Sequence, residues 1–108
     1  MFIKKQQFLL RFYLDESHKF NNIPLYEYLI LKARELKIAG ATAFRGIMGY
    51  GKQNHLHTNK IVDLGNQLPV LVEIIDSETK IMELINPLQS ELSSYTLTLQ
   101  PIDLLLSE

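Results

Sequence analysis

Glycines and basic side chains gather in one stretch of the chain, where their types and spacing suggest a binding site. Four of the five glycines lie between residues 40 and 51, and a polar segment with Lys52 follows them. Glycine serves where the backbone takes a positive φ or approaches another group closely. Backbone N–H groups freed by Gly49 and Gly51 could bind a phosphate, and Arg45 or Lys52 could add positive charge. The spacing matches neither a Walker loop nor a dinucleotide fingerprint, so a bulge and a turn explain the glycines equally well.

Two histidines in the same polar segment, His55 and His57, form a His-x-His pair. In an extended segment both side chains project from one side and could hold zinc or copper. A third ligand would have to come from His18, from Asp63 or from another subunit, and no spacing in the chain determines which. Histidines in loops are more often solvated or hydrogen-bonded within the loop. We therefore predict no metal site and keep metal binding as an alternative.

The composition excludes several kinds of chemistry. The chain has no cysteine, which rules out disulfides, a thiolate nucleophile and cysteine-ligated metal. No serine lies in a nucleophile-elbow motif, so we expect no enzymatic activity and no cofactor. The net charge of −1, from 11 basic and 12 acidic residues, argues against a nucleic-acid partner.

The hydropathy pattern indicates a cytoplasmic protein. No apolar run reaches the roughly 18 uncharged residues that a membrane span requires. Residues 1–7 lack the apolar core of a signal peptide. We therefore predict a cytoplasmic location with no direct membrane insertion.

Hydrophobic periodicity predicts one domain over residues 1–108 with the order βαββαβ. Alternation of apolar and polar residues, or enrichment in β-branched residues, indicates strands over 8–15, 41–48, 68–75 and 95–102. Apolar residues at helical spacing indicate helices over 24–39 and 77–92, while Glu16–Ile23 forms a polar connection. Two helices can then cover one face of a four-stranded antiparallel sheet, which makes the chain an α+β domain.

Prolines and capping residues set the boundaries of these elements. Pro24 suits the first turn of a helix, and Gly40 is predicted to be its C-terminal cap. Asp76 or Ser77 can cap the second helix, and Pro87 predicts a kink or restart within it. Pro101 lacks a ladder donor, so the last strand is predicted to lie at a sheet edge or to end there.

A set of short motifs resembles a bacterial and archaeal family that is uncharacterised and related to the PII signalling proteins. The resemblance covers roughly residues 8–90 and rests on Glu16-Ser17, Pro24-Leu25-Tyr26-Glu27, Ala39-Gly40-Ala41-Thr42, Arg45-Gly46, Gly49-Tyr50-Gly51, His57-Thr58, Leu68-Pro69-Val70 and the stretch from Glu73 to Asp76. It implies a ferredoxin-like fold, a homotrimer and a regulatory role. It does not name a ligand.

The resemblance also gives the long segment from Gly49 to Gln67 a function. It corresponds to the loop with which PII proteins touch their targets, and its base lies near clefts between subunits where PII proteins bind nucleotides. The predicted ligand-binding residues are Arg45, Gly49, Tyr50, Gly51, His57 and Thr58. PII proteins also have a basic, glycine-containing loop after the second helix. Here residues 90–95 contain neither glycine nor a basic residue, which argues against binding ATP in the PII manner.

Charged residues within the predicted strands indicate a subunit interface. In a ferredoxin-like sheet, strands 8–15 and 68–75 are central neighbours and strand 41–48 flanks the latter. Arg11, Arg45 and Glu73 are then predicted to lie on the face without helices, among Leu9, Tyr13, Ile47, Leu71 and Ile75. So much apolar area rarely stays exposed on a monomer. We therefore predict that Arg11, Tyr13, Arg45 and Glu73 lie between subunits, with an open, solvated face as the alternative.

These inferences combine into one prediction with two alternatives. The chain is predicted to be a PII-like trimeric regulator whose long loop binds a protein partner, such as a membrane transporter or channel. A small anionic ligand, for example a nucleotide, would gate that loop. The first alternative is a trimer that binds divalent metal and resembles the CutA copper-tolerance proteins. The second is an adaptor with no small ligand.

Overall fold

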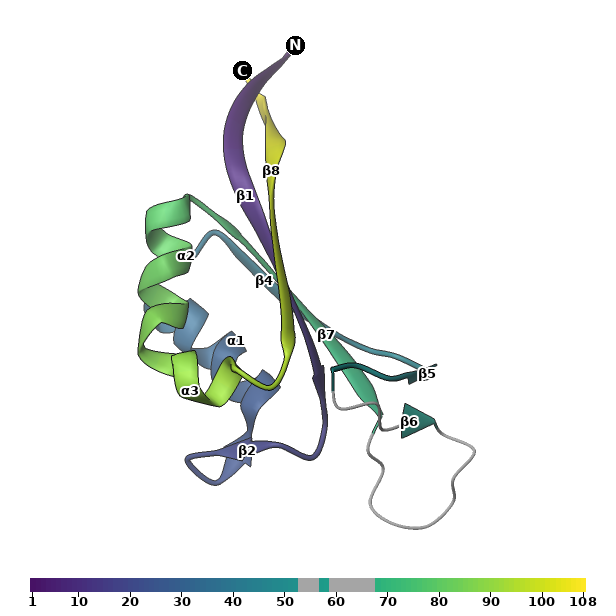
Figure 1. Ribbon diagram of the computed structural model, residues 1–108. Coiled ribbons are helices and arrows are strands. Elements are labelled where there is room, and N and C mark those ends of the chain that lie inside the picture. Colours follow the sequence, from purple (N-terminus) through teal and green to yellow (C-terminus); the bar gives the residue numbers. More distant parts are fainter. Residues whose placement is uncertain (53–56, 59–67) are drawn as a thin grey trace.

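A single antiparallel sheet organises the protein, with helices on one face (Figure 1). The computed structural model describes residues 1–52, 57–58 and 68–108. The sheet contains β1 (Phe2–Asp15), β4 (Gly40–Arg45), β7 (Pro69–Asp76) and β8 (Thr96–Ser107), in the order β4-β7-β1-β8. β1 and β7 are therefore central neighbours and β4 flanks β7, as predicted. The α+β, ferredoxin-like fold is confirmed.

The helices and the short strands complete the chain. α1 (Leu25–Glu35) and α2 (Glu78–Ile85) lie on the same side of the sheet, and η1 (Asn86–Leu88) and α3 (Gln89–Leu92) continue from α2 (Figure 1). Two small ladders pair β2 (Lys19–Phe20) with β3 (Ile23–Pro24), and β5 (Met48–Gly49) with β6 (His57–Thr58). None of the helices in the described residues is long and apolar enough to cross a membrane.

The hydrophobic core lies between the helices and the sheet. Phe12, Val72 and Ile74 contribute from β1 and β7, and Leu29 and Ile81 contribute from α1 and α2; all five are completely buried. Complete burial of each such side chain stabilises the fold by about 1.5–3 kcal/mol. The period-2 pattern of the central strands therefore places one set of residues in the core and leaves the alternate set on the open face.

The C-terminal end of α1 differs from the prediction. Gly40 does not cap α1 but begins β4. The helix ends instead at Leu36, where Lys37 takes a φ of 60°. The Ile38 N–H donates to the Ala33 carbonyl and the Lys37 N–H donates to the Arg34 carbonyl, both at 3.0 Å, which defines a Schellman motif. Ile38 packs against the core, and this contact holds a non-glycine residue in the left-handed conformation.

Pro24 lies in β3 and is the N-cap of α1, so it precedes the first helical turn in which the sequence placed it. The remaining boundary predictions are confirmed. Ser77 caps α2, since its Oγ accepts a hydrogen bond from the Lys80 N–H at 3.2 Å. The helix restarts at Pro87 through η1 and α3. β8 is an edge strand, as Pro101 predicted, although it continues beyond that residue to Ser107. An edge strand tolerates proline because only one of its sides carries a ladder.

Two features were not predicted. The connection from Glu16 to Ile23 contains the β2–β3 hairpin, in which Asn21 and Asn22 have φ values of 54° and 68°. Two successive positive φ values are typical of the type I′ hairpin turn, which favours asparagine. In addition, β1 and β8 run well past the predicted strands. Their ladder extends from the Tyr13–Thr96 pair to the Phe2–Ser107 pair.

Candidate functional site

A cleft of about 310 Å³ lies where β1 and β4 end, where β7 begins and where the segment after Gly51 begins. Four of the predicted ligand-binding residues, Arg45, Gly49, Tyr50 and Gly51, line it. The other lining residues come from neighbouring strand ends and from the turn before β8: Tyr13, Leu14, Asp15, Phe44, Gly46, Met48, Lys52, Pro69, Val70, Leu71, Ser94 and Tyr95. The structure thus brings together residues that are up to 82 positions apart (13 to 95) in the chain.

Gly46 allows the chain to turn from β4 into the cleft wall. Its N–H donates to the Pro69 carbonyl at 2.8 Å, which extends the β4–β7 ladder by one bond. A Cβ atom at Gly46 would lie only 2.9 Å from Pro69 Cγ, whereas one at Gly49 would lie 3.5 Å from that atom. Gly51 has no neighbour within 4 Å of such a Cβ. Close approach, and not a positive φ, therefore explains the glycine at position 46.

Arg45 lies on the opposite side of the sheet from the one predicted. It pairs with Val70, whose side chain is buried beneath the helices, so the two share the helix-covered face. Antiparallel partners always share a face, so the strand register contradicts the prediction that Arg45 lies on the face without helices together with Arg11 and Glu73. Arg45 Nη2 contacts Glu16 Oε2 at 2.6 Å, and Glu16 Oε1 accepts the Leu68 N–H at 3.2 Å. The Arg45 side chain is 61% exposed, so this pair contributes at most about 1 kcal/mol.

The turn before β8 forms the opposite wall of the cleft, and sequence reasoning placed no binding residue there. Lys52 Nζ donates to the Ser93 carbonyl at 3.1 Å, which ties the start of the segment after Gly51 to this turn. Tyr95 lies half-buried beside the cleft. Burial, aided by the charges of Asp15 and Glu91, raises the pKa of Tyr95 to about 12, so its hydroxyl remains protonated near neutral pH. The only local sequence signal for a binding residue in this turn was the aromatic residue at the start of the last predicted strand.

A polar network supports this wall from the side of β1. Asp15 Oδ1 accepts the backbone N–H groups of Ser17 at 2.8 Å and His18 at 3.3 Å. His18 Nε2 lies 2.8 Å from Glu91 Oε2, and the His18 ring meets Tyr95 edge-on at 5.6 Å between centroids. These contacts join the end of β1 to α3 and to the start of β8, and they fix where Tyr95 lies.

The metal alternative gains no support in the part of the chain that the structure describes. His18, one of the residues considered as a third ligand, lies beside Glu91. No cluster of three metal-ligating side chains occurs within residues 1–52, 57–58 and 68–108. His55 and Asp63 lie outside these residues. The backbone of His57 and Thr58 forms β6, whose partners Gly49 and Met48 both line the cleft.

The open face of the sheet carries an ion pair between Arg11 and Glu73, two of the charged residues predicted to lie there. Arg11 Nε lies 3.0 Å from Glu73 Oε2, and Arg11 Nη1 donates to Gln100 Oε1 at 2.8 Å. The aromatic residues on this face, Tyr13 and Phe44, are 45% and 47% exposed. Phe44 pairs with Leu71 and so takes the place predicted for Arg45. Ile47 follows the end of β4 and does not extend this face.

The chain belongs to the DUF190 family, described as "Uncharacterized ACR, COG1993", whose pattern matches residues 7–104. It is 40% identical over 89 residues to a UPF0166 protein of Aquifex aeolicus (strain VF5), covering 82% of this chain and 83% of the relative. It is 34% identical over 73 residues to a UPF0166 protein of Methanocaldococcus jannaschii, covering 68% of this chain and 67% of the relative. The suspected membership of an uncharacterised PII-like family is confirmed.

Solved structures share the fold. CPII, a nitrogen regulatory PII-like protein from Thiomonas intermedia K12 bound to ADP, AMP and bicarbonate, superposes with a TM-score of 0.66. The identity is 12%, over 98% of this chain and 92% of CPII. A chain from Thermus thermophilus, named as a candidate PII-like signalling protein, gives a TM-score of 0.58 at 16% identity, over 95% of this chain and 91% of that one. At these identities the likeness defines a PII-like fold.

Proposed function

We propose that this protein is a PII-like regulator whose cleft binds a small anionic ligand of the nucleotide class. The observation that carries the proposal is the cleft itself, which combines the backbone of β4 and β5 with two cationic side chains and four aromatic rings. Ligand binding changes the affinity of the segment after Gly51 for a protein partner. The protein acts by binding and is expected to have neither enzymatic activity nor a resident cofactor.

The chemistry of the cleft favours a nucleotide over a simple anion. Its volume of about 310 Å³ lies within the range of small-molecule pockets. Tyr13, Phe44, Tyr50 and Tyr95 offer aromatic surface to a base. Arg45 and Lys52 offer positive charge at the end nearest the glycines. CPII is bound to ADP, AMP and bicarbonate, which supports this class of ligand.

The number of phosphates is expected to be small. Among residues 1–52 and 68–108, the cationic side chains that line the cleft are those of Arg45 and Lys52, and Arg45 is already paired with Glu16. Residues 90–95, which form the facing wall, contain no basic residue. Three phosphate groups would leave negative charge without a partner, so a nucleoside mono- or diphosphate fits better than a triphosphate.

The proposed assembly is a homotrimer held by the open sheet face. That face carries Leu9, Leu71 and Ile75 around the Arg11–Glu73 pair, with Tyr13 and Phe44 exposed beside them. Packing against other subunits would cover this face while the ion pair stays hydrogen-bonded, and would leave the cleft, which Tyr13 and Phe44 also line, at the edge of the interface. Within the cell we propose a cytoplasmic location and a partner such as a membrane transporter or channel.

Thermal melting with and without ligands tests the proposal. A compound that binds only the folded state raises the melting temperature by mass action. We expect a rise with ADP or AMP, a smaller rise with ATP, and a weaker response to ADP in Gly49→Val, whose Cβ meets only ordinary contacts. The unliganded melting temperature of that variant serves as its folding control.

Other outcomes would overturn the proposal in distinct ways. A shift with zinc or copper that disappears in His57→Ala would favour the metal-binding alternative. The absence of a shift with any nucleotide, bicarbonate or metal would favour an adaptor that binds proteins alone. An undiminished ADP response in Gly49→Val would place the nucleotide outside this cleft.

A further inference from the structure

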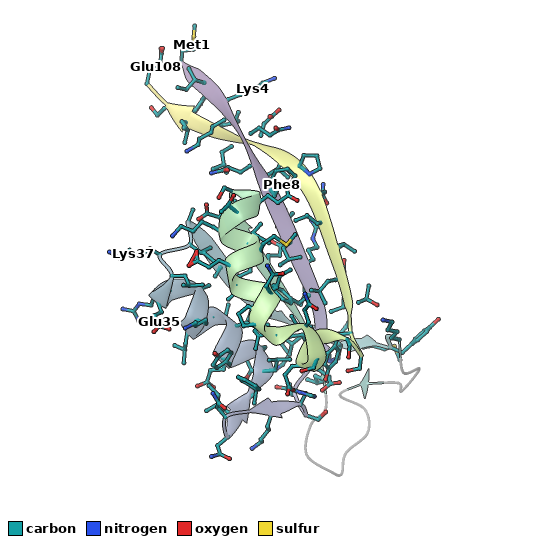
Figure 2. The ribbon with its side chains drawn as sticks, turned by 60° about the vertical axis from the view of Figure 1, so that its left-hand side comes forward. Met1, Lys4, Phe8, Glu35, Lys37 and Glu108 are labelled. Carbon is teal, nitrogen blue, oxygen red and sulfur yellow. The ribbon has the colours of Figure 1, made fainter. Side chains whose placement is uncertain are left out.

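The two terminal strands continue beyond the sheet as a free-standing ribbon, here called the terminal ribbon and defined as residues 2–7 and 102–107. Its ladder pairs Phe2 with Ser107 and Gln7 with Ile102, while β7 joins β1 only from Phe8 onward. Figure 2 shows Met1, Lys4 and Glu108 standing clear of the helices. Within the residues that the structure describes, each strand of the terminal ribbon therefore has one backbone edge without a neighbouring strand.

The tip of the terminal ribbon is apolar on both of its faces. Because antiparallel partners share a face, Ile3 and Leu106 lie on one side and are 48% and 38% exposed. Phe2 and Leu105 lie on the other side and are 66% and 60% exposed. A strand with one solvated face alternates apolar and polar residues, whereas a strand covered on both faces has an unbroken apolar run. The run Leu104-Leu105-Leu106 has the second pattern.

The charges of the terminal ribbon separate onto its two edges. Lys4 and Lys5 belong to β1, while Asp103 belongs to β8 and Glu108 follows it. In the part of the chain that the structure describes, none of these four side chains forms an ion pair. Two positive and two negative charges cancel, so the tip has no net attraction for an anionic lipid surface. The basic edge of the terminal ribbon in one copy is therefore complementary to the acidic edge of the terminal ribbon in another copy.

We propose that the terminal ribbon joins copies of this chain, with the basic β1 edge of one copy beside the acidic β8 edge of the next. An unpaired strand edge is a template for pairing with another chain, and opposite charges select which edges meet. The contact covers apolar side chains that a lone ribbon leaves in water. Since each copy offers one edge of each kind, the contact is heterologous and can close a ring. This contact is separate from the one proposed at the open sheet face. The proposal does not depend on the ligand proposed for the cleft.

Cross-linking tests which edges meet. Because the chain has no native cysteine, a thiol-specific cross-linker reacts only at the introduced cysteines. The variants Lys4→Cys and Asp103→Cys are mixed in equal amounts, treated with a short bismaleimide and resolved by mass spectrometry. We expect dimers with one chain of each kind, at least tenfold above the background. That background is measured with Lys37→Cys, which replaces an exposed lysine on the body of the protein, mixed with Asp103→Cys (Figure 2).

Exchanging the charges supplies an independent test. Lys4→Glu with Lys5→Glu, or Asp103→Lys alone, should raise the dissociation constant between copies at least tenfold in analytical ultracentrifugation. Combining all three substitutions in one chain exchanges the two edges and should restore association. Circular dichroism reports whether each variant is folded.

Three results would overturn the proposal. The first is cross-linking no higher than the Lys37→Cys background, which would mean that the lysines and Pro101 only protect the edges from pairing. The second is cross-linking confined to identical variants, which would indicate a two-fold contact between like edges. The third is capture of the unmodified chain by vesicles of phosphatidylcholine and phosphatidylglycerol, lost in Leu105→Ser, which would assign the apolar tip to lipid.

Discussion

The two ends of β1 have opposite characters. At Asp15 the strand ends in a cleft where polar groups are held by their own chain, through Ser17, His18 and the turn that carries Tyr95. At Phe2 the strand ends in the terminal ribbon, with apolar side chains exposed and charges unpaired within the described residues. A site whose groups are already positioned suits a small ligand, whereas unsatisfied surface suits a second macromolecule. This contrast distinguishes the cleft, proposed to bind a ligand, from the terminal ribbon, proposed to join copies of the chain.

The largest effect is expected where the two ends share a core. Phe12 is completely buried between the helices and the centre of β1. Phe12→Ala leaves a cavity and should lower the free energy of unfolding by about 3–5 kcal/mol. Chemical denaturation would measure the loss. If Phe12→Ala lowered the free energy of unfolding by less than about 1 kcal/mol, the stability of the two ends of β1 would not depend on this common core.

A substitution at Gly46 should damage the cleft end alone. Gly46→Ala places a Cβ 2.9 Å from Pro69 Cγ, so the β4–β5 turn must shift. Overpacking of this kind costs about 1–3 kcal/mol of stability. Gly40→Ala is the matched control, since its Cβ would lie 3.7 Å from Ile75 Cβ in ordinary contact. Equal melting temperatures for the two variants would contradict the close approach at Gly46.

Tyr95 should make the cleft end sensitive to alkaline pH. Its pKa is raised to about 12 in the folded protein, against an ordinary value of 10.0. The unfolded chain therefore loses this proton first as pH rises. The stabilising contribution is complete below pH 10 and is lost as pH rises toward 12.

The Tyr95→Phe variant isolates that contribution. Denaturation of both proteins between about pH 9 and pH 11.5 should show a steeper decline in stability for the unsubstituted chain. The titration of other tyrosines and lysines is common to both proteins and cancels in the difference. Parallel declines would mean that Tyr95 ionises as freely in the folded protein as in the unfolded chain.

The smallest effect on the stability of a single chain is expected at the terminal ribbon. Leu105 is 60% exposed, so Leu105→Ser should change the free energy of unfolding by no more than about 0.5 kcal/mol when measured at low protein concentration. Association at high concentration should weaken in the same variant. A large loss of stability at low concentration would show that the terminal ribbon supports its own fold, and would weaken the contrast between the two ends of β1.

Most of the fold was predictable because its signals are local. Alternation in the central strands, the serine at position 77 and the proline at position 87 each act over a few residues, and each prediction was confirmed. The cleft was predictable in part, since Arg45, Gly49, Tyr50 and Gly51 do line it. The C-terminal cap was not, because the Schellman motif at Lys37 depends on Ile38 packing against the core.

The sequence by itself determined the order of the strands and helices, because periodicity is written into neighbouring residues. The pairing of Arg11 with Glu73 required the register between β1 and β7. Only the tertiary structure decided the face on which Arg45 lies, because a register shift of one residue moves a side chain to the other side of the sheet. It also brought Lys52 to Ser93 and extended β1 and β8 into the terminal ribbon. These contacts join residues 41 or more positions apart, and no local pattern records which distant partners will meet.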